Sequence, residues 1–252
     1  MFQFDPTHLS IVLCEPQQPG NIGSVARAMA NFGVSDLRLV NPCQHLHPEA
    51  RKFAVAANHL LGSAKIYGDL ASAIADLQCT IATTRRQGRL RGNLLDSTKV
   101  PTLMGTLPEG TKAGLIFGRE DCGLSSQDVA LCSHAATVAT TDKNGSLNLA
   151  QAVLLFLYEL ARTPATQYAP EAACVNHLPQ MTEYEELFGL QEEIVERIAY
   201  LNPSKPQATM NTLRHIHRKA DLSIEELNFL RGLWRQVSKS INDWPGKKRG
   251  GS

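Results

Sequence analysis

The sequence predicts an α/β protein, in which a parallel sheet carries helices on both faces, followed by a small all-helical region. From the first residues to about residue 163, short β-rich runs alternate with helical patterns, as they do in parallel sheets covered by helices. Beyond a segment rich in Pro, Ala and Thr, only helical patterns occur. The chain has 252 residues, of which 43% are hydrophobic. This length suits one α/β domain of about 150 residues and a smaller partner.

Each strand is expected where a short apolar run lies between turn residues. The expected strands are 9–14, 37–40, 79–84, 113–117 and 136–140. The expected helices of this part are 21–29, 50–57, 70–77, 126–132 and 149–162. Asn21 is expected to cap the first helix, and Gly33 to end it. Such a fold often binds nucleotides, but a fold by itself assigns no chemistry.

The composition changes after Arg162 and indicates a second domain. Three helical patterns follow, and Ser223 with Glu226 forms a capping box for the last of them. These helices are expected at 183–200, 208–219 and 224–241. We therefore expect a sheet domain at 1–163, a linker at 164–182, a helical domain at 183–244 and a disordered tail at 245–252.

Composition and charge exclude several classes of protein. The 25 basic and 24 acidic residues nearly cancel, so the overall charge favours no partner. The 6 cysteines form no CxxC pair, which fits a reduced, cytoplasmic protein. The N-terminus lacks the basic start of a signal peptide. The longest apolar run, 150–161, falls short of the ~20 residues of a membrane span, so no membrane segment is expected.

No metal site is expected either. His215 and His217 lie two apart on a predicted helix, so their side chains point away from each other. His45 and His47 lie in a loop that offers no third ligand.

Three polar, glycine-containing loops follow predicted strands, where open α/β sheets place their ligand crevice. They are 17–28, 116–126 and 140–152. Each loop alone has a plain structural interpretation: a capped helix with a surface arginine, a charged strand-to-helix turn, and a helix N-cap at Asn148. None contains the GxGxxG or GxxxxGKS pattern that a dehydrogenase or a kinase of this architecture needs.

Taken together, the three loops resemble the motifs of one family. They contain N-x-G-x-x-x-R at 21–27, F-G-x-E-x-x-G-L at 117–124 and S-L-N-L-A at 146–150. In order and spacing, these motifs resemble the 2′-O-ribose (TrmH-like) branch of the SPOUT superfamily of RNA methyltransferases. The resemblance implies a C-terminal trefoil knot in the sheet domain, S-adenosylmethionine as cofactor, and a homodimer. Among these enzymes, the chain is most similar to bacterial tRNA methyltransferases that act on cytidine or uridine 32 and carry a helical C-terminal extension.

The resemblance also assigns site residues. The cofactor-binding residues that it implies are Thr83, Thr84, Arg85, Gly118, Val138, Gly145, Ser146 and Leu147. The catalytic set that it implies is Arg27, Ser146, Asn148, Glu120 and Asn21. A methyl donor of this kind already carries an activated methyl group, so the protein has to align a ribose hydroxyl and favour loss of its proton. Because a guanidinium stays protonated at neutral pH, we expect Arg27 to stabilise negative charge on the 2′-oxygen rather than to act as a base.

Two acid-poor stretches are candidates for tRNA binding. Arg86, Arg89 and Arg91, together with Arg85 and Lys99, flank the crevice as a phosphate track, or else form a solvated loop; this stretch is more basic and glycine-rich than is typical of the family. The second stretch contributes Lys205, Arg214, Arg218 and Lys219. Trp234 and Trp244 are candidates for base stacking, although the apolar neighbours of Trp234 favour a place in the core.

Some alternatives stay open at this point. Helix 149–162 is apolar on nearly all faces, which fits either a dimer interface or a fully buried helix of a monomer. The substrate could be another tRNA position or ribosomal RNA. A non-catalytic RNA-binding protein of the same fold is a further alternative, although Arg27, Ser146 and Asn148 are all present.

Overall fold

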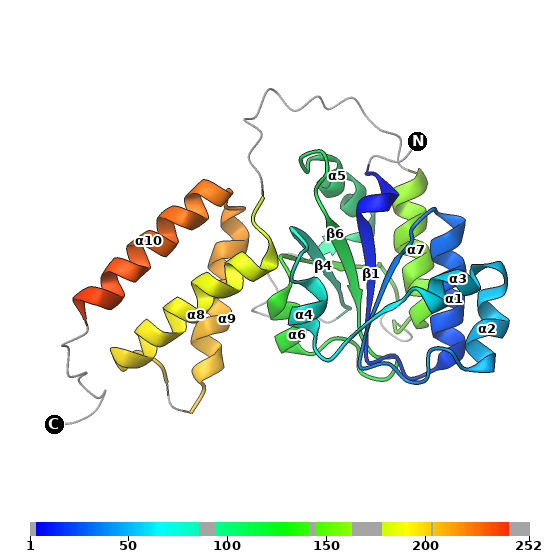
Figure 1. Cartoon of the computed structure of the whole chain (residues 1–252), viewed down its shortest axis with the longest axis horizontal. Helices are drawn as coiled ribbons and strands as arrows, with labels where there is room; N and C mark the ends of the chain where they lie inside the picture. Colours follow the sequence, from blue (N-terminus) through cyan, green and yellow to red (C-terminus); the bar gives the residue numbers. More distant parts are fainter. Residues whose placement is uncertain (1–3, 86–93, 142–144, 163–177, 203, 242–252) are drawn as a thin grey trace.

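The computed structural model describes residues 4–85, 94–141, 145–162, 178–202 and 204–241. Figure 1 shows two parts: a sheet covered by helices, and three helices that extend from one side of it. No helix among the described residues is long and apolar enough to cross a membrane.

The sheet has seven parallel strands in the order β3-β2-β1-β6-β4-β7-β5. Their bounds are β1 (Leu9–Cys14), β2 (Asp36–Val40), β3 (Lys65–Tyr67), β4 (Cys79–Thr83), β5 (Leu95–Asp96), β6 (Ala113–Phe117) and β7 (His134–Thr137). Strand β1 is buried along its whole length between β2 and β6. This explains why its sequence is a continuous apolar run rather than an alternating one.

Helices cover both faces of the sheet, as predicted (Figure 1). The helices of this part are α1 (Pro19–Asn31), α2 (Pro48–Ala54), α3 (Asn58–Gly62), α4 (Leu70–Ile74), α5 (Val100–Gly105), α6 (Ser126–Leu131) and α7 (Leu149–Arg162), with 3-10 turns η1 (Pro6–His8), η2 (Val55–Ala57) and η3 (Ser97–Lys99). Alternate residues of β1 point to opposite faces: Ile11 and Leu13 pack in the core under α1 and α7, whereas Val12 packs in the core under α4 and α6.

The helical part consists of α8 (Met181–Arg197), α9 (Pro206–Ala220) and α10 (Ile224–Ser240). Helix α8 lies in the middle and contacts the two others. Leu187 and Leu227 are fully buried between α8 and α10. The predicted capping box of α10 is confirmed: Oγ of Ser223 accepts a hydrogen bond from the amide of Glu226, and the carboxylate of Glu226 accepts one from the amide of Ser223.

The structure differs from the predicted elements in several places. The helix predicted to be capped by Asn21 instead begins at Pro19, whose fixed φ suits the first helical turn. Gly33, with a φ of 73°, follows the end of that helix as predicted. Strand β7 lies two residues earlier than expected, and α8 begins at Met181.

Short elements were missed: the edge strands β3 and β5 and the helices α3 and α5. They are too short to show a hydrophobic period, and α5 contains a proline. The trefoil knot stays a prediction of the family resemblance, and the tail 245–252 lies outside the described residues.

Candidate active site

A cavity of about 340 Å³ opens where β4, β6 and β7 end. All eight predicted cofactor-binding residues line it: Thr83, Thr84, Arg85, Gly118, Val138, Gly145, Ser146 and Leu147. Parallel strands bring their carboxyl ends to the same edge of a sheet, so loops far apart in the sequence meet there.

Two glycines of the cavity have close neighbours at the position that a Cβ atom would occupy. A Cβ atom on Gly118 would lie 2.2 Å from the backbone of Gly123 and Leu124, because the loop after β6 folds back on itself in a tight turn. That turn is closed by a hydrogen bond from the amide of Gly123 to the carbonyl of Arg119 (2.9 Å). A Cβ atom on Gly145 would lie 2.3 Å from the guanidinium of Arg85. The lack of a side chain at Gly118 therefore allows this tight turn, and at Gly145 it makes room for Arg85.

The three sequence motifs are joined by a chain of hydrogen bonds. The side-chain amide of Asn148 donates to Oδ1 of Asn21 (2.9 Å), and Nδ2 of Asn21 donates to Oε1 of Glu120 (2.9 Å). These residues lie 127 and 99 positions apart in the sequence. Asn148 also caps α7, since its Oδ1 accepts from the amide of Ala150 (2.9 Å). Its predicted N-cap role is thus confirmed and combined with a long-range contact.

The carboxylate of Glu120 anchors the start of α1. It accepts hydrogen bonds from the backbone amides of Gln17 (2.9 Å) and Gln18 (3.2 Å) as well as from Asn21. The N-terminal amides of a helix lack intrahelical partners and carry partial positive charge, so a carboxylate is the group that suits them. Glu120 therefore holds Asn21 and the segment that leads into α1 in place.

Replacing Glu120 by glutamine is expected to lower kcat/KM for the reaction at this site by about ten- to a hundredfold. The NH₂ of the new amide group would face N–H groups that now donate to the carboxylate, so at least one hydrogen bond would be lost. One hydrogen bond to a charged group contributes roughly 1.5–3 kcal/mol. Steady-state kinetics would measure the effect, with Glu109→Gln, an exposed carboxylate outside the site, as the control. Activity equal to that of the parent protein would show that the reaction does not depend on the Glu120 carboxylate.

Sequence analysis missed a second set of contacts beside Glu120. Arg119 forms ion pairs with Glu15 (3.1 Å) and with Asp121 (2.8 Å). The hydrogen bonds from Arg119 hold the pKa of the Asp121 carboxyl well below its usual range. These ion pairs join the loop after β1 to the loop after β6. The charged triplet at 119–121 was the only sequence signal for them, and it did not reveal the partner at Glu15.

Arg27 lies apart from the other predicted catalytic residues. Its side chain is exposed on α1, and it does not line the cavity in the described part of the chain. It is six residues from Asn21, which places the two side chains on different sides of the helix. One chain alone does not bring Arg27 to its own cavity.

The predicted RNA-binding residues differ in exposure and in the contacts that they make. Lys205 is exposed at the N-cap of α9. Arg214 is largely buried. It forms an ion pair with Glu185, and its guanidinium lies 4.4 Å from the ring centre of Phe188, so its contacts in the structure are within the helical part. Trp234 packs against the core of the helical part. The remaining residues of these predictions lie outside what the structure describes: Arg86, Arg89, Arg91, Trp244 and the side chains of Arg218 and Lys219.

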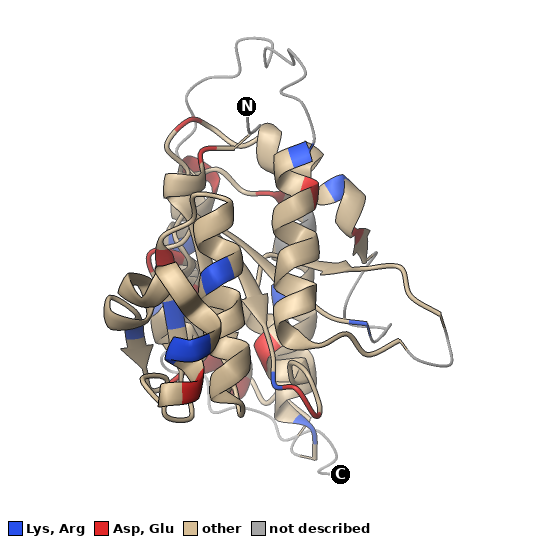
Figure 2. Cartoon of the chain, turned by 90° about the vertical axis from the view of Figure 1, so that its right-hand side faces the viewer, with Lys and Arg blue, Asp and Glu red and all other residues tan. Residues whose placement is uncertain are grey.

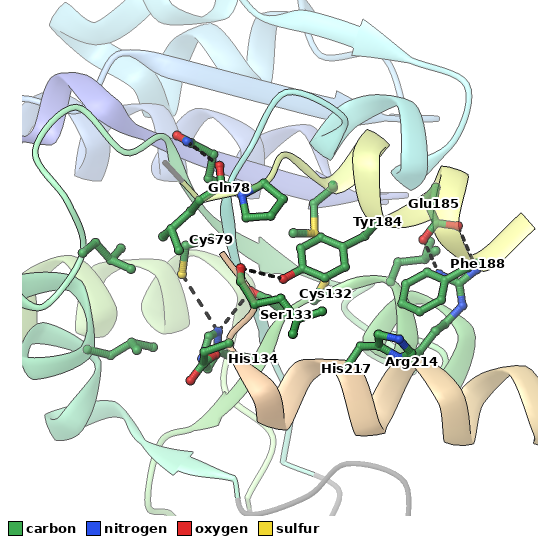
Figure 3. Close-up of a pocket in the computed structure, with 18 of the residues that line it drawn as sticks. Gln78, Cys79, Cys132, Ser133, His134, Tyr184, Glu185, Phe188, Arg214 and His217 are labelled. Atoms are coloured by element: carbon green, nitrogen blue, oxygen red, sulfur yellow. Dashed lines mark hydrogen bonds and ion pairs between the residues drawn. The ribbon is translucent and has the colours of Figure 1, made fainter. Parts of the chain in front are cut away.

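A second cavity, of about 220 Å³, lies between the sheet part and the helical part (Figure 3). Its polar groups bond to one another: the ring Nδ1 of His134 lies 3.0 Å from Oγ of Ser133 and 4.0 Å from Sγ of Cys79. Burial raises the pKa of the Cys79 thiol to about 12, so this cysteine is no nucleophile at neutral pH. The described residues contain no group of three or more His, Cys, Asp or Glu that could hold a metal ion.

The chain matches two family models. The model of the SpoU rRNA Methylase family matches residues 8–158, and that of the tRNA methyltransferase TrmJ C-terminal domain matches residues 182–245. The first of these segments contains the sheet, the cavity and all three motifs.

Relatives cover nearly the whole chain. It is 32% identical over 245 residues to the tRNA (cytidine/uridine-2'-O-)-methyltransferase TrmJ of Cronobacter sakazakii, which covers 94% of this chain and 99% of the relative. Among solved structures, TrmJ from Z. mobilis superimposes with a TM-score of 0.80 at 31% identity, covering 91% of this chain and 98% of that one. A methylase family protein from Haemophilus influenzae superimposes with a TM-score of 0.57 at 27% identity, covering 94% and 99%. The chain therefore belongs to the SpoU rRNA Methylase family.

Proposed function

We propose that this protein is an S-adenosylmethionine-dependent tRNA methyltransferase that methylates the ribose 2′-oxygen of cytidine or uridine 32 in the anticodon loop. The observation that carries the proposal is the hydrogen-bonded chain from Asn148 through Asn21 to Glu120, which assembles the three motifs beside one cavity. The relatives named as tRNA (cytidine/uridine-2'-O-)-methyltransferases support the substrate class.

The cavity fits the cofactor in size and in lining. At about 340 Å³, it lies within the usual range of small-molecule sites. Gly118 and Gly145 line it without side chains, and the exposed Arg85 offers a cation for a carboxylate. When bound, S-adenosylmethionine supplies an electrophilic methyl group on its sulfonium.

The residues of the chain have separate roles in this proposal. Ser146 and Asn148 are exposed just before the N-terminus of α7, where they position the ribose. Arg27 binds the adjacent phosphate and stabilises the negative charge that develops on the 2′-oxygen. Glu120 and Asn21 hold the N-terminal end of α1 in place.

A homodimer brings Arg27 of one copy to the cavity of the other. Helices α1 and α7 lie side by side, and Figure 2 shows the side of the molecule that carries them, where α7 bears charge only near its last turn. Together, the two helices contain only Arg27, Glu159 and Arg162 as charged residues. On α7, Leu154 and Tyr158 are 43% and 52% exposed and lie one turn apart. Such an apolar, charge-poor face suits an isologous interface.

Replacing Leu154 by glutamate is expected to convert the dimer into monomers at micromolar concentration, since a carboxylate would be buried against its own symmetry mate. Sedimentation velocity would measure the change. The control is Ile66→Glu, which places the same charge at a 50% exposed site on the edge strand β3. A parent protein that is already monomeric would refute the shared site.

The same proposal covers location and domain organisation. We infer a cytoplasmic protein, because its relatives act on tRNA. A sheet domain at 1–163 and a helical domain at 183–244 are supported by the separate matches of the two family models. The helical domain contributes tRNA contacts, with Lys205 as its exposed candidate.

Incubation with S-adenosylmethionine carrying a labelled methyl group and with unmodified tRNA, followed by nucleoside analysis, tests the function. Label in a 2′-O-methylated pyrimidine of the anticodon loop is expected. Label at another nucleotide of the tRNA would change the position assigned to the substrate. The absence of any label despite cofactor binding would indicate another RNA as substrate or a non-catalytic RNA-binding protein.

A further inference from the structure

Helix α2 packs directly against the side of α1 that carries Arg27. The two helices touch at Gly23, where a Cβ atom would lie 2.0 Å from the carbonyl oxygen of Ala50. Gly20, Gly23 and Arg27 are spaced three and four residues apart, so they share one side of α1. The glycine of the first motif therefore has a packing role: it lets α2 lie beside the exposed arginine.

An aromatic side chain at this contact between α1 and α2 is partly exposed to solvent. The ring of Phe53 lies 3.2 Å from the position of a Cβ atom on Gly20, next to the active-site residue Asn21, and yet Phe53 is 45% exposed. Lys52, its neighbour in the helix, is exposed as well. Immediately after α2, Val55 has a φ of 53°, which is a strained conformation for a β-branched residue. Backbone strain of this kind tends to lie at functional sites.

We propose that α2 binds the tRNA strand next to the target nucleotide, with Phe53 stacking on an unpaired base and Lys52 contacting a phosphate. This inference rests on the proposed function and extends it to a surface outside the motifs. Proteins bind single-stranded RNA by combining stacking aromatic side chains with cations that follow the backbone. Helix α2 combines both, whereas α7 offers exposed apolar side chains with charge only near its last turn and suits a second copy of the chain.

The stacking contact is tested with Phe53→Ala and Phe53→Trp. Loss of one base stack is expected to weaken binding of unmodified tRNA by about five- to a hundredfold, whereas tryptophan, which stacks equally well, keeps affinity within about twofold. KM for tRNA is expected to rise, while kcat and the affinity for S-adenosylmethionine stay unchanged. Phe53→Leu separates stacking from apolar packing, since it is expected to behave like the alanine variant.

The phosphate contact is tested through salt dependence. Removing one phosphate contact with Lys52→Ala is expected to reduce the slope of log Kd against log salt concentration by about one. The matched control is Arg51→Ala. Arg51 lies about 200° around the helix from Phe53, whereas Lys52 lies about 100° from it, so this variant is expected to keep the parent slope.

Two results would overturn the inference. One is tRNA affinity of Phe53→Ala equal to that of the parent protein. The other is dissociation of the Phe53→Ala dimer in sedimentation velocity, which would make α2 a contact between protein copies. Failure of the parent protein to methylate any tRNA would instead contradict the proposed function, and the two failures are therefore distinguishable.

Discussion

Replacing Arg27 by alanine is expected to lower kcat for tRNA methylation by at least about a hundred- to a thousandfold. Removal of one preorganised group that stabilises a developing oxyanion typically has an effect of this size. The affinity for S-adenosylmethionine is expected to stay unchanged, because the proposed contacts of Arg27 are with the phosphate and the 2′-oxygen of the substrate rather than with the cofactor. Single-turnover kinetics together with calorimetric titration of the cofactor would separate the two quantities. Near-normal methylation by this variant would remove Arg27 from the mechanism.

A mixing experiment extends this prediction to the shared site. Arg27→Ala and a variant with a blocked cavity are each expected to be inactive alone. After unfolding and refolding as an equal mixture, about half of the dimers would be mixed, and each would contain one complete site. About a quarter of the parent activity is then expected. If both variants are inactive alone and the mixture stays inactive, Arg27 acts within its own subunit.

Replacing Gly118 by alanine is expected to block the cavity and to weaken binding of S-adenosylmethionine by at least about a hundredfold. The added Cβ atom would lie 2.2 Å from the backbone of Gly123 and Leu124, so the whole turn that lines the cavity has to move. Overpacking of this kind also destabilises a fold by roughly 1–3 kcal/mol. Calorimetric titration and thermal unfolding would measure the two effects, and this variant supplies the blocked cavity for the mixing experiment.

The control for Gly118 is a glycine with free space around it. Gly189 lies in helix α8, where an added Cβ atom meets nothing within 4 Å. Gly189→Ala is expected to leave cofactor affinity unchanged and to stabilise the helix slightly. Unchanged cofactor affinity in Gly118→Ala would contradict the assignment of this cavity to the cofactor.

Much of the fold could be predicted from local sequence. The long buried runs of β1 and β6 and the apolar helix α7 show their character within a few residues, and their predicted bounds agree with the structure. The edge strands β3 and β5 could not be found, because three and two residues show no period. They become strands only because a neighbouring strand offers free backbone groups.

The sequence by itself determined that Asn21, Glu120 and Asn148 belong to one site, because the motifs around them resemble those of a known family in order and spacing. Only the tertiary structure decided what they do to one another: the side chains meet across 99 and 127 positions through hydrogen bonds that no local pattern encodes. The same holds for Arg214, a cation of a basic stretch whose charge is paired with Glu185 on another helix. Sequence patterns report the period and polarity of a segment, whereas partners are set by packing between segments far apart in the chain.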